Sequence, residues 1–207
     1  MPYTFPLIPK KNFMQKIVLA SGSPRRKQLL EWARVDFDII VPPIEESVPA
    51  DVPLQEVPVH IARDKAFAVK ATHEYKRYEP GIPVLSADTI VVCDGQILGK
   101  PADRENAIAM LGLLSGKKHE VMTGVFLTNG EKEEHFTEVT EVWFYELTQQ
   151  QIQFYVDEYQ PYDKAGAYGI QEWMGVVGIQ RIAGDFYNVM GLPVSRVVQL
   201  IENWSDR

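Results

Sequence analysis

The fold is decided by the stretch IVLASGSPRRKQLLEWA at residues 17–33. Its first four residues are all apolar, which is typical of a strand that is buried on both faces. Ser23 suits the N-cap of a helix and Pro24 suits its first position, so we predict a helix from Pro24 to about Ala33. A strand that leads through a short loop into a helix is the opening unit of an α/β protein.

The remainder of the chain continues to alternate between strand and helix signals. Asn129-Gly130 between two strand-like runs indicates a hairpin, which requires antiparallel neighbours, whereas the leading strand and helix favour parallel ones. The predicted fold class is therefore α/β with a mixed twisted sheet flanked by helices. Further helices are expected at about 58–70, 103–115, 148–158 and from 193 onward, and further strands at 37–41, 84–92, 97–98 and on both sides of the hairpin turn.

Composition limits the classes of function. The 207 residues suit one domain, which we place at 16–207, after a flexible proline-containing extension at 1–15. A single cysteine, Cys93, cannot form an internal disulfide, which favours a reducing, cytoplasmic compartment. No apolar run is long enough to cross a membrane. The net charge of −7 disfavours binding to nucleic acid, because that affinity comes from neutralising phosphates.

The loop after the first strand has the makings of a phosphate site. Ser21, Ser23, Arg25 and Arg26 surround the start of the predicted helix, where backbone N–H groups and the helix dipole favour anions. Guanidinium groups and hydroxyls would add further donors to a phosphate. Ordinary capping by Ser23, with both arginines on a solvated helix face, would explain the same residues.

A second candidate is Asp88, which interrupts the apolar run at 84–92. A carboxylate is costly to bury without a partner or a metal ion, so it either serves chemistry, pairs with a lysine or faces water. Glu46 adds a carboxylate in an acidic loop, where solvation is the simpler explanation. Lys65 and Lys100 are isolated lysines that would ordinarily be surface charges.

The third candidate is DKAGAYGIQ at 163–171, which contains Lys164 and Gln171 and two glycines. Glycines let a backbone approach a ligand closely, but they also serve ordinary turns. The four histidines show no metal-ligand spacing with Cys93. The sequence also lacks the common phosphate-binding, nucleophile-elbow and dinucleotide-binding motifs.

Taken in order, five blocks of sequence resemble the motifs of the Maf family of nucleoside triphosphate pyrophosphatases. They are ASGSPRR at 20–26, SADT at 86–89, LGKP at 98–101, DKAGAYGIQ at 163–171 and VMGLP at 189–193. The resemblance implies a fold related to inosine triphosphatases, with two lobes around a cleft. It also implies hydrolysis of a nucleoside triphosphate to its monophosphate and pyrophosphate, with Mg²⁺, Mn²⁺ or Co²⁺, in a homodimer.

The resemblance also implies roles for individual residues. Arg25, Thr89 and Gln171 match the subgroup specific for dTTP and UTP, and a sister subgroup acts on 7-methyl-GTP. Asp88 would be the proton acceptor and would hold the metal ion with Glu46. The triphosphate would lie against Ser21, Ser23, Arg26, Lys65, Lys100 and Lys164. Two alternatives remain open, namely a modified nucleotide as substrate and a nucleotide-binding regulator of cell division.

Overall fold

The computed structural model describes residues 14–41, 44, 52–78 and 81–205. Its sheet contains seven strands, which are β1 (Ile17–Leu19), β2 (Phe37–Ile39), β3 (Val84–Cys93), β4 (Gln96–Leu98), β5 (Lys118–Thr128), β6 (Glu133–Phe144) and β7 (Ile179–Ala183). The α-helices are α1 (Pro24–Trp32), α2 (Val57–Ala71), α3 (Arg104–Leu114), α4 (Gln149–Tyr159), α5 (Trp173–Val177), α6 (Phe186–Val189) and α7 (Val194–Ser205). None of the helices in these ranges is long and apolar enough to cross a membrane. Most of the extension predicted at 1–15 lies outside the described residues.

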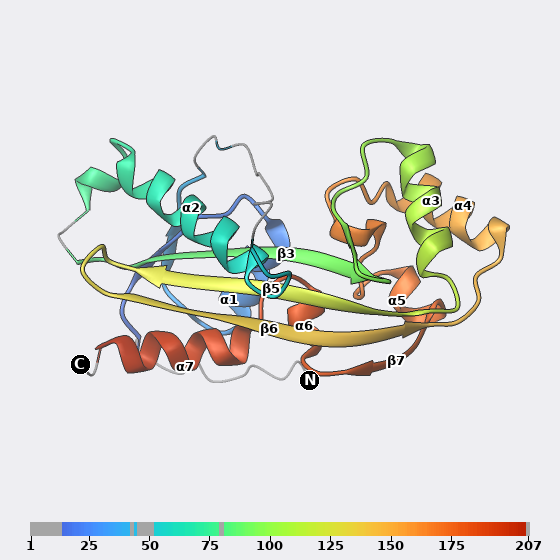
Figure 1. The fold of residues 1–207 in the computed structure, drawn as a ribbon. Helices are drawn as coiled ribbons and strands as arrows, with labels where there is room; N and C mark the ends of the chain where they lie inside the picture. Colours follow the sequence, from blue (N-terminus) through green and yellow to red (C-terminus); the bar gives the residue numbers. More distant parts are fainter. Residues whose placement is uncertain (1–13, 42–43, 45–51, 79–80, 206–207) are drawn as a thin grey trace, which may run out of the picture.

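The sheet is mixed, as predicted. Its strand order is β2-β1-β3-β5-β6-β7, and β4 pairs with β3 off this path. β1 runs parallel to both β2 and β3. The other pairs, β3–β4, β3–β5, β5–β6 and β6–β7, are antiparallel. The hairpin predicted around Asn129-Gly130 joins β5 to β6, the two longest strands. These long strands carry the chain from one end of the molecule to the other (Figure 1).

Different helices cover the two faces of the sheet, and β3 shows this most clearly. Leu85, Ala87 and Val91 belong to a core cluster that includes apolar side chains of α1 and α7. Val84 belongs to a second cluster with side chains of α2. Because successive side chains of a strand point to opposite faces, Asp88 is directed toward α2 and Thr89 toward the face of α1. Figure 1 shows α2 and α7 on opposite sides of the strands.

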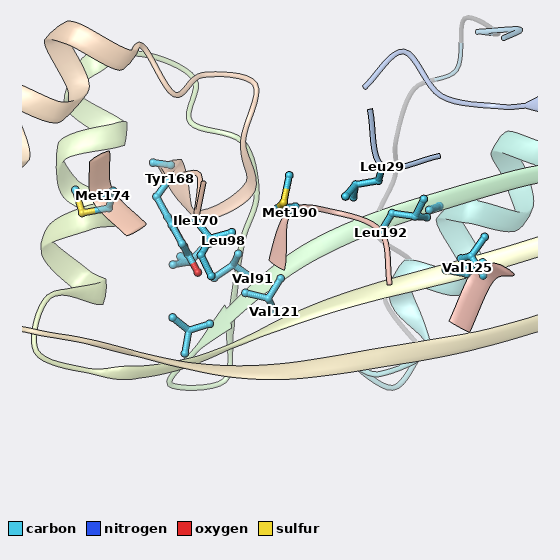
Figure 2. Close-up of a cluster of buried hydrophobic side chains, with 14 of the residues drawn as sticks. Leu29, Val91, Leu98, Val121, Val125, Tyr168, Ile170, Met174, Met190 and Leu192 are labelled. Atoms are coloured by element: carbon cyan, nitrogen blue, oxygen red, sulfur yellow. The ribbon is translucent and has the colours of Figure 1, made fainter. Parts of the chain in front are cut away.

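A second lobe forms at the far end of the long strands, where α3, α4 and α5 gather (Figure 1). The hydrophobic core nevertheless runs through both lobes without a break. Figure 2 shows it extending from Met174 and Tyr168 in the second lobe, past Val91 and Met190, to Leu192 in the first. The architecture thus has two helical lobes on one sheet and one shared core.

Side chains cap the first turns of α1, α3 and α4, and the cap of α1 at Ser23 was predicted. The Ser23 hydroxyl accepts from the backbone N–H of Arg26 to begin α1, and Asp103 caps α3 in the same way. Thr148 and Gln151 form a complete capping box at the start of α4. The segment 167–190, for which the sequence predicts no helix or strand, contains α5, β7 and α6.

A gap in the sheet lies where the first motif crosses β3. β1 pairs with β3 only at Val84 and Leu85, and β4 pairs with it only from Val91 onward. Within the described ranges, no strand pairs with this edge of β3 at 86–90. The loop at 20–23 and the start of α1 lie beside this edge, because the Arg26 side chain hydrogen-bonds to the Ala87 carbonyl. The gap leaves room for a ligand at the carboxyl end of β1, the usual place for one in an α/β sheet.

Candidate active site

A cavity of about 580 Å³ opens at this gap between the lobes. Its walls come from the loop before α1, from α2, from β3 and from the segments 97–100, 163–171 and 189–191. Every predicted site residue that the structure describes lines it, namely Ser21, Ser23, Arg25, Arg26, Lys65, Asp88, Thr89, Lys100, Lys164 and Gln171. Glu46 lies outside the described residues. Five motifs spread over residues 20–193 of the sequence therefore meet in one place.

Asp88 and Lys65 form a nearly buried ion pair on the α2 side of the cavity. The Lys65 ammonium donates to Asp88 Oδ1 at 2.6 Å, and the two side chains are only 12% and 9% exposed. The expectation that Lys65 is an ordinary surface charge is therefore wrong. Of the alternatives for Asp88, pairing with a lysine is realised, and the carboxylate still lines the cavity. This pairing places one negative and one positive group side by side at the cavity wall.

The loop before α1 presents hydroxyls and backbone donors to the same cavity. Ser23 caps the helix, and Ser21 Oγ accepts hydrogen bonds from the Ser23 N–H at 3.2 Å and from Arg26 Nη1 at 3.3 Å. Both acceptor sites of the Ser21 hydroxyl are thus engaged, so it can offer its proton to a ligand oxygen. The positive end of the α1 dipole faces the cavity beside these groups.

Arg26 is buried, which excludes the expectation that both arginines lie on a solvated helix face. Its guanidinium donates to the carbonyls of Ala87 and Gly191, each at 2.8 Å, and to Thr89 Oγ1 at 3.0 Å. These carbonyl and hydroxyl partners hold the guanidinium at the wall of the cavity. Arg26 therefore combines a structural role, joining α1 to β3 and to the turn at Gly191, with a charge for an anion.

Arg25 reaches across the cavity to the second lobe. Its Nη1 lies 2.6 Å from Asp163 Oδ2, and the Lys164 ammonium lies 2.7 Å from Oδ1 of the same carboxylate. Partial burial opposes ionisation of Asp163, but the hydrogen bonds from Lys164 and Arg25 lower its pKa. Lys164 also pairs with Glu172 at 3.2 Å. The cations of the two lobes thus share one central carboxylate.

Comparison with known proteins assigns the chain to a family. The sequence model described as Maf-like protein matches residues 16–204. The chain belongs to the Maf family. A relative from Bacteroides thetaiotaomicron, called dTTP/UTP pyrophosphatase, is 48% identical over 88% of this chain and 92% of its own length. Proteins of the same name from Cytophaga hutchinsonii and Bacillus cytotoxicus are 49% and 48% identical, over 90% and 93% of this chain and 83% and 97% of their own lengths.

Membership of the Maf family agrees with the mixed sheet and the flanking helices predicted from the sequence. The resemblance that carried the prediction spans the same part of the chain as the family match, from about Ile17 onward.

The Maf cavity also contains polar residues to which the sequence analysis gave no role. Asp163, the first residue of the fourth motif, joins Arg25 to Lys164. Below the cavity, Thr123 and Asn188 are fully buried. Thr123 Oγ1 lies 3.3 Å from the Asn188 carbonyl oxygen and 2.9 Å from Thr89 Oγ1. A threonine within the otherwise apolar run at 121–127 was the available signal for Thr123.

The glycines of the segment 163–171 also form an ordinary turn, which was the simpler explanation for them. Gly166 has a positive φ of 69°, and a Cβ there would lie 3.0 Å from Val91. Its backbone N–H donates to the Gly99 carbonyl, so the run is fixed against the LGKP motif. Lys100 and Gln171 are both exposed residues of the cavity lining. The turn thereby brings the fourth motif beside the third.

The carboxylates of the cavity suit a divalent cation that arrives with its phosphate. Among the described lining residues these are Asp88 and Asp163, and the described ranges contain no cluster of three or more His, Cys, Asp or Glu side chains that could hold a metal ion. Mg²⁺ is commonly held by one or two carboxylates together with substrate phosphate oxygens. The residues present therefore fit a metal ion that takes some of its ligands from the protein carboxylates and the others from the phosphates of a bound triphosphate.

Proposed function

We propose that the protein hydrolyses dTTP and UTP to the monophosphate and pyrophosphate, the activity named for its relatives. The observation that carries this proposal is the single cavity in which Asp88 lies among Arg25, Arg26, Lys65, Lys100 and Lys164. Such a ring of cations suits a polyphosphate, because phosphoryl transfer mainly demands positioning and neutralisation of charge. Modified pyrimidine nucleoside triphosphates fit the same chemistry.

The triphosphate binds against the first motif and the surrounding cations in this proposal. Ser21 and Ser23 offer hydroxyl and backbone donors at the start of α1, and Arg26 and Lys65 supply positive charge on either side of β3. Lys100 and Lys164 close the opposite wall. Because Asp163 already pairs with Arg25 and Lys164, an incoming phosphate competes with this carboxylate for both cations.

Asp88 acts as the proton acceptor in the proposed reaction. A water molecule attacks the α-phosphorus, its proton passes to Asp88, and the bond between the α-phosphorus and the bridging oxygen breaks to release pyrophosphate. Lys65, 2.6 Å from Asp88, orients the carboxylate and balances its charge. Asp88, and Glu46 outside the described residues, would hold Mg²⁺, Mn²⁺ or Co²⁺, which would help neutralise the phosphate charges when bound.

Gln171, Thr89 and Arg25 select the base in this proposal. The amide of Gln171 can both donate and accept, which suits the O4 and N3–H edge of uracil or thymine. Cytosine presents an amino donor where thymine presents the O4 acceptor. A cytosine base would therefore leave a hydrogen-bonding group of these side chains without its partner, and the loss of one hydrogen bond costs about 0.5–1.5 kcal/mol.

The test is a panel of nucleoside triphosphates scored by pyrophosphate release. We expect release from dTTP and UTP with Mg²⁺, Mn²⁺ or Co²⁺, little from CTP, ATP or GTP, and loss of activity when EDTA removes the metal. Release from 7-methyl-GTP alone would instead assign the substrate of the sister subgroup. Nucleotide binding without any release would favour a regulatory protein over an enzyme.

Two wider features of the proposal have tests of their own. We propose a cytoplasmic enzyme, on the strength of its single cysteine, and a homodimer, on the strength of the family resemblance. Light scattering coupled to size-exclusion chromatography measures the oligomeric state directly. A monomeric mass at micromolar concentration would exclude the stable dimer.

A further inference from the structure

A chain of hydrogen bonds runs beneath the cavity, on the side of the sheet away from α2. It begins at Arg26, whose Nη2 donates to Thr89 Oγ1 at 3.0 Å, and continues from Thr89 to Thr123 at 2.9 Å. Thr123 Oγ1 lies 3.3 Å from the carbonyl oxygen of Asn188. Thr89 and Thr123 are directly opposite each other on β3 and β5, so the sheet itself fixes this contact.

Asn188 holds the far end of this chain in place. Its side-chain amide donates to the carbonyls of Val121 and Glu138 and to Thr140 Oγ1 at 3.0–3.3 Å, which joins α6 to β5 and β6. Thr123, Thr140 and Asn188 are all fully buried. Thr123 does not line the cavity, but its hydroxyl contacts Thr89, which does.

The hydrogen-bonding capacity of Thr89 is nearly filled by this arrangement. A hydroxyl has one proton and two acceptor sites. Arg26 occupies one acceptor site of Thr89, and Thr123 occupies the second if its own proton points toward Thr89. The other acceptor within reach of Thr123, the Asn188 carbonyl, already receives the Gly191 N–H at 2.9 Å and is farther away. Thr123 can therefore donate to Thr89 without leaving that carbonyl unsatisfied.

We propose that Thr123 is a specificity-determining positioning residue, which makes the Thr89 hydroxyl a hydrogen-bond donor only. The proton of Thr89 then has one protein acceptor in the described structure, the Gly191 carbonyl, at the 3.5 Å limit of a hydrogen bond. A uracil or thymine carbonyl competes readily for that proton. The amino group of cytosine finds no free acceptor on Thr89. This inference rests on the proposed function, in which Thr89 contributes to the choice of base.

Replacing Thr123 with valine tests the proposal, because valine keeps the shape and removes the hydroxyl. The change frees one acceptor site on Thr89, so CTP gains a partner while UTP gains nothing. We expect the ratio of kcat/KM for UTP over CTP to fall about fivefold to tenfold, the worth of one hydrogen bond. Thr123→Ser keeps the hydroxyl and should keep the wild-type ratio.

A matched control is available on the same strand. Thr128 is also fully buried in β5, and its hydroxyl donates to the Lys132 carbonyl at 2.9 Å, remote from the cavity lining. Thr128→Val should lower the stability of the protein, because a buried hydroxyl and its hydrogen bond are lost. It should leave the ratio of kcat/KM for UTP over CTP unchanged. The double variant Thr89→Val/Thr123→Val should show the same ratio as Thr89→Val alone, since Thr123 acts only through Thr89.

The outcomes separate this inference from the proposed function. The inference is overturned if a folded Thr123→Val protein keeps the wild-type ratio of kcat/KM for UTP over CTP, or has a higher one. Continued release of pyrophosphate from UTP would show that the proposed function still holds. If Thr123→Val does not fold, Thr123→Ala takes its place with the same expected fall. If the wild type binds UTP without turnover, the proposed function fails. The role of Thr123 is then tested by the ratio of the Kd values for UTP and CTP, compared between the wild type and Thr123→Val. A wild type that does not distinguish UTP from CTP overturns the inference.

Discussion

Replacing Asp88 with asparagine separates its chemistry from its structural pairing. The substitution keeps the size of the side chain and an oxygen that can accept from Lys65, but it removes the ability to take up a proton. General-base assistance contributes about 10²–10⁴ in rate, so we expect kcat for UTP to fall by that factor. Lys65 and the other cations remain, so the KM for UTP should change by only a few fold.

The same substitution should lower stability measurably. The Lys65 ammonium lies 2.6 Å from a carboxylate that is only 9% exposed, so solvent does little to replace the lost charge. A hydrogen bond between charged groups contributes about 1.5–3 kcal/mol, and asparagine retains part of it. We therefore expect a loss of about 1–2 kcal/mol, which for a chain of this size lowers Tm by about 2–8 °C.

Pyrophosphate release and thermal unfolding followed by circular dichroism provide the two measurements. Asp157→Asn is the matched control, because Asp157 pairs with Arg104 at 2.6 Å but on the exposed surface. Exposed pairs contribute little, so this variant should keep both turnover and Tm. Turnover of Asp88→Asn near the wild-type value would refute the base role. A fall in Tm no larger than that of Asp157→Asn would refute the assumption of a solvent-shielded pair.

Three further predictions follow from the geometry. Gln171→Ala should lower the UTP to CTP ratio of kcat/KM by at least about fivefold, because an amide partner of the base is lost; an unchanged ratio would remove Gln171 from base selection. Gly166→Ala should destabilise the protein by about 1–3 kcal/mol in urea unfolding, because φ is 69° and the new Cβ would lie 3.0 Å from Val91. Burial lowers the pKa of His119 to about 4 from 6.5, so the unfolded chain takes up a proton first as the pH falls. Stability should therefore drop by up to about 3 kcal/mol between pH 6.5 and 4, and His119→Gln should flatten that part of the unfolding profile.

Local signals in the sequence predicted most of the regular structure. The caps at Ser23, Asp103 and Thr148 depend on neighbours within three residues, so a reader of the sequence has all of the relevant partners in view. The short helices α5 and α6 were missed because four or five residues carry too little periodicity to be recognised. Helices of that length depend on tertiary contacts, such as those of the fully buried Met174 and Asn188.

The site was predictable as a set of motifs but not as a set of contacts. Nothing near Arg26 in the sequence indicates that its guanidinium is buried, because its carbonyl partners lie 61 and 165 residues away. Lys65 was misjudged for the same reason, since Asp88 is 23 residues distant and on another element. Periodicity assigns a residue to a face of a strand or helix, but only the folded chain shows which charge lies opposite.

The first motif explains why the fold has a cavity at all. Pro24 cannot donate a backbone hydrogen bond and Ser23 caps a helix, so these residues end β1 after Leu19 and turn the chain into α1. A longer β1 would continue its pairing with β3 past Leu85 and fill the edge at 86–90. Because it stops, the Ala87 carbonyl is left for the Arg26 side chain, and Asp88 and Thr89 border an open space. The residues that end the strand are thus the same ones that supply hydrogen-bond donors to an anion. The gap and the groups that bind a ligand there arise from one sequence feature. A protein of net charge −7 can therefore have a polyphosphate site, because several of its basic side chains lie together around this gap.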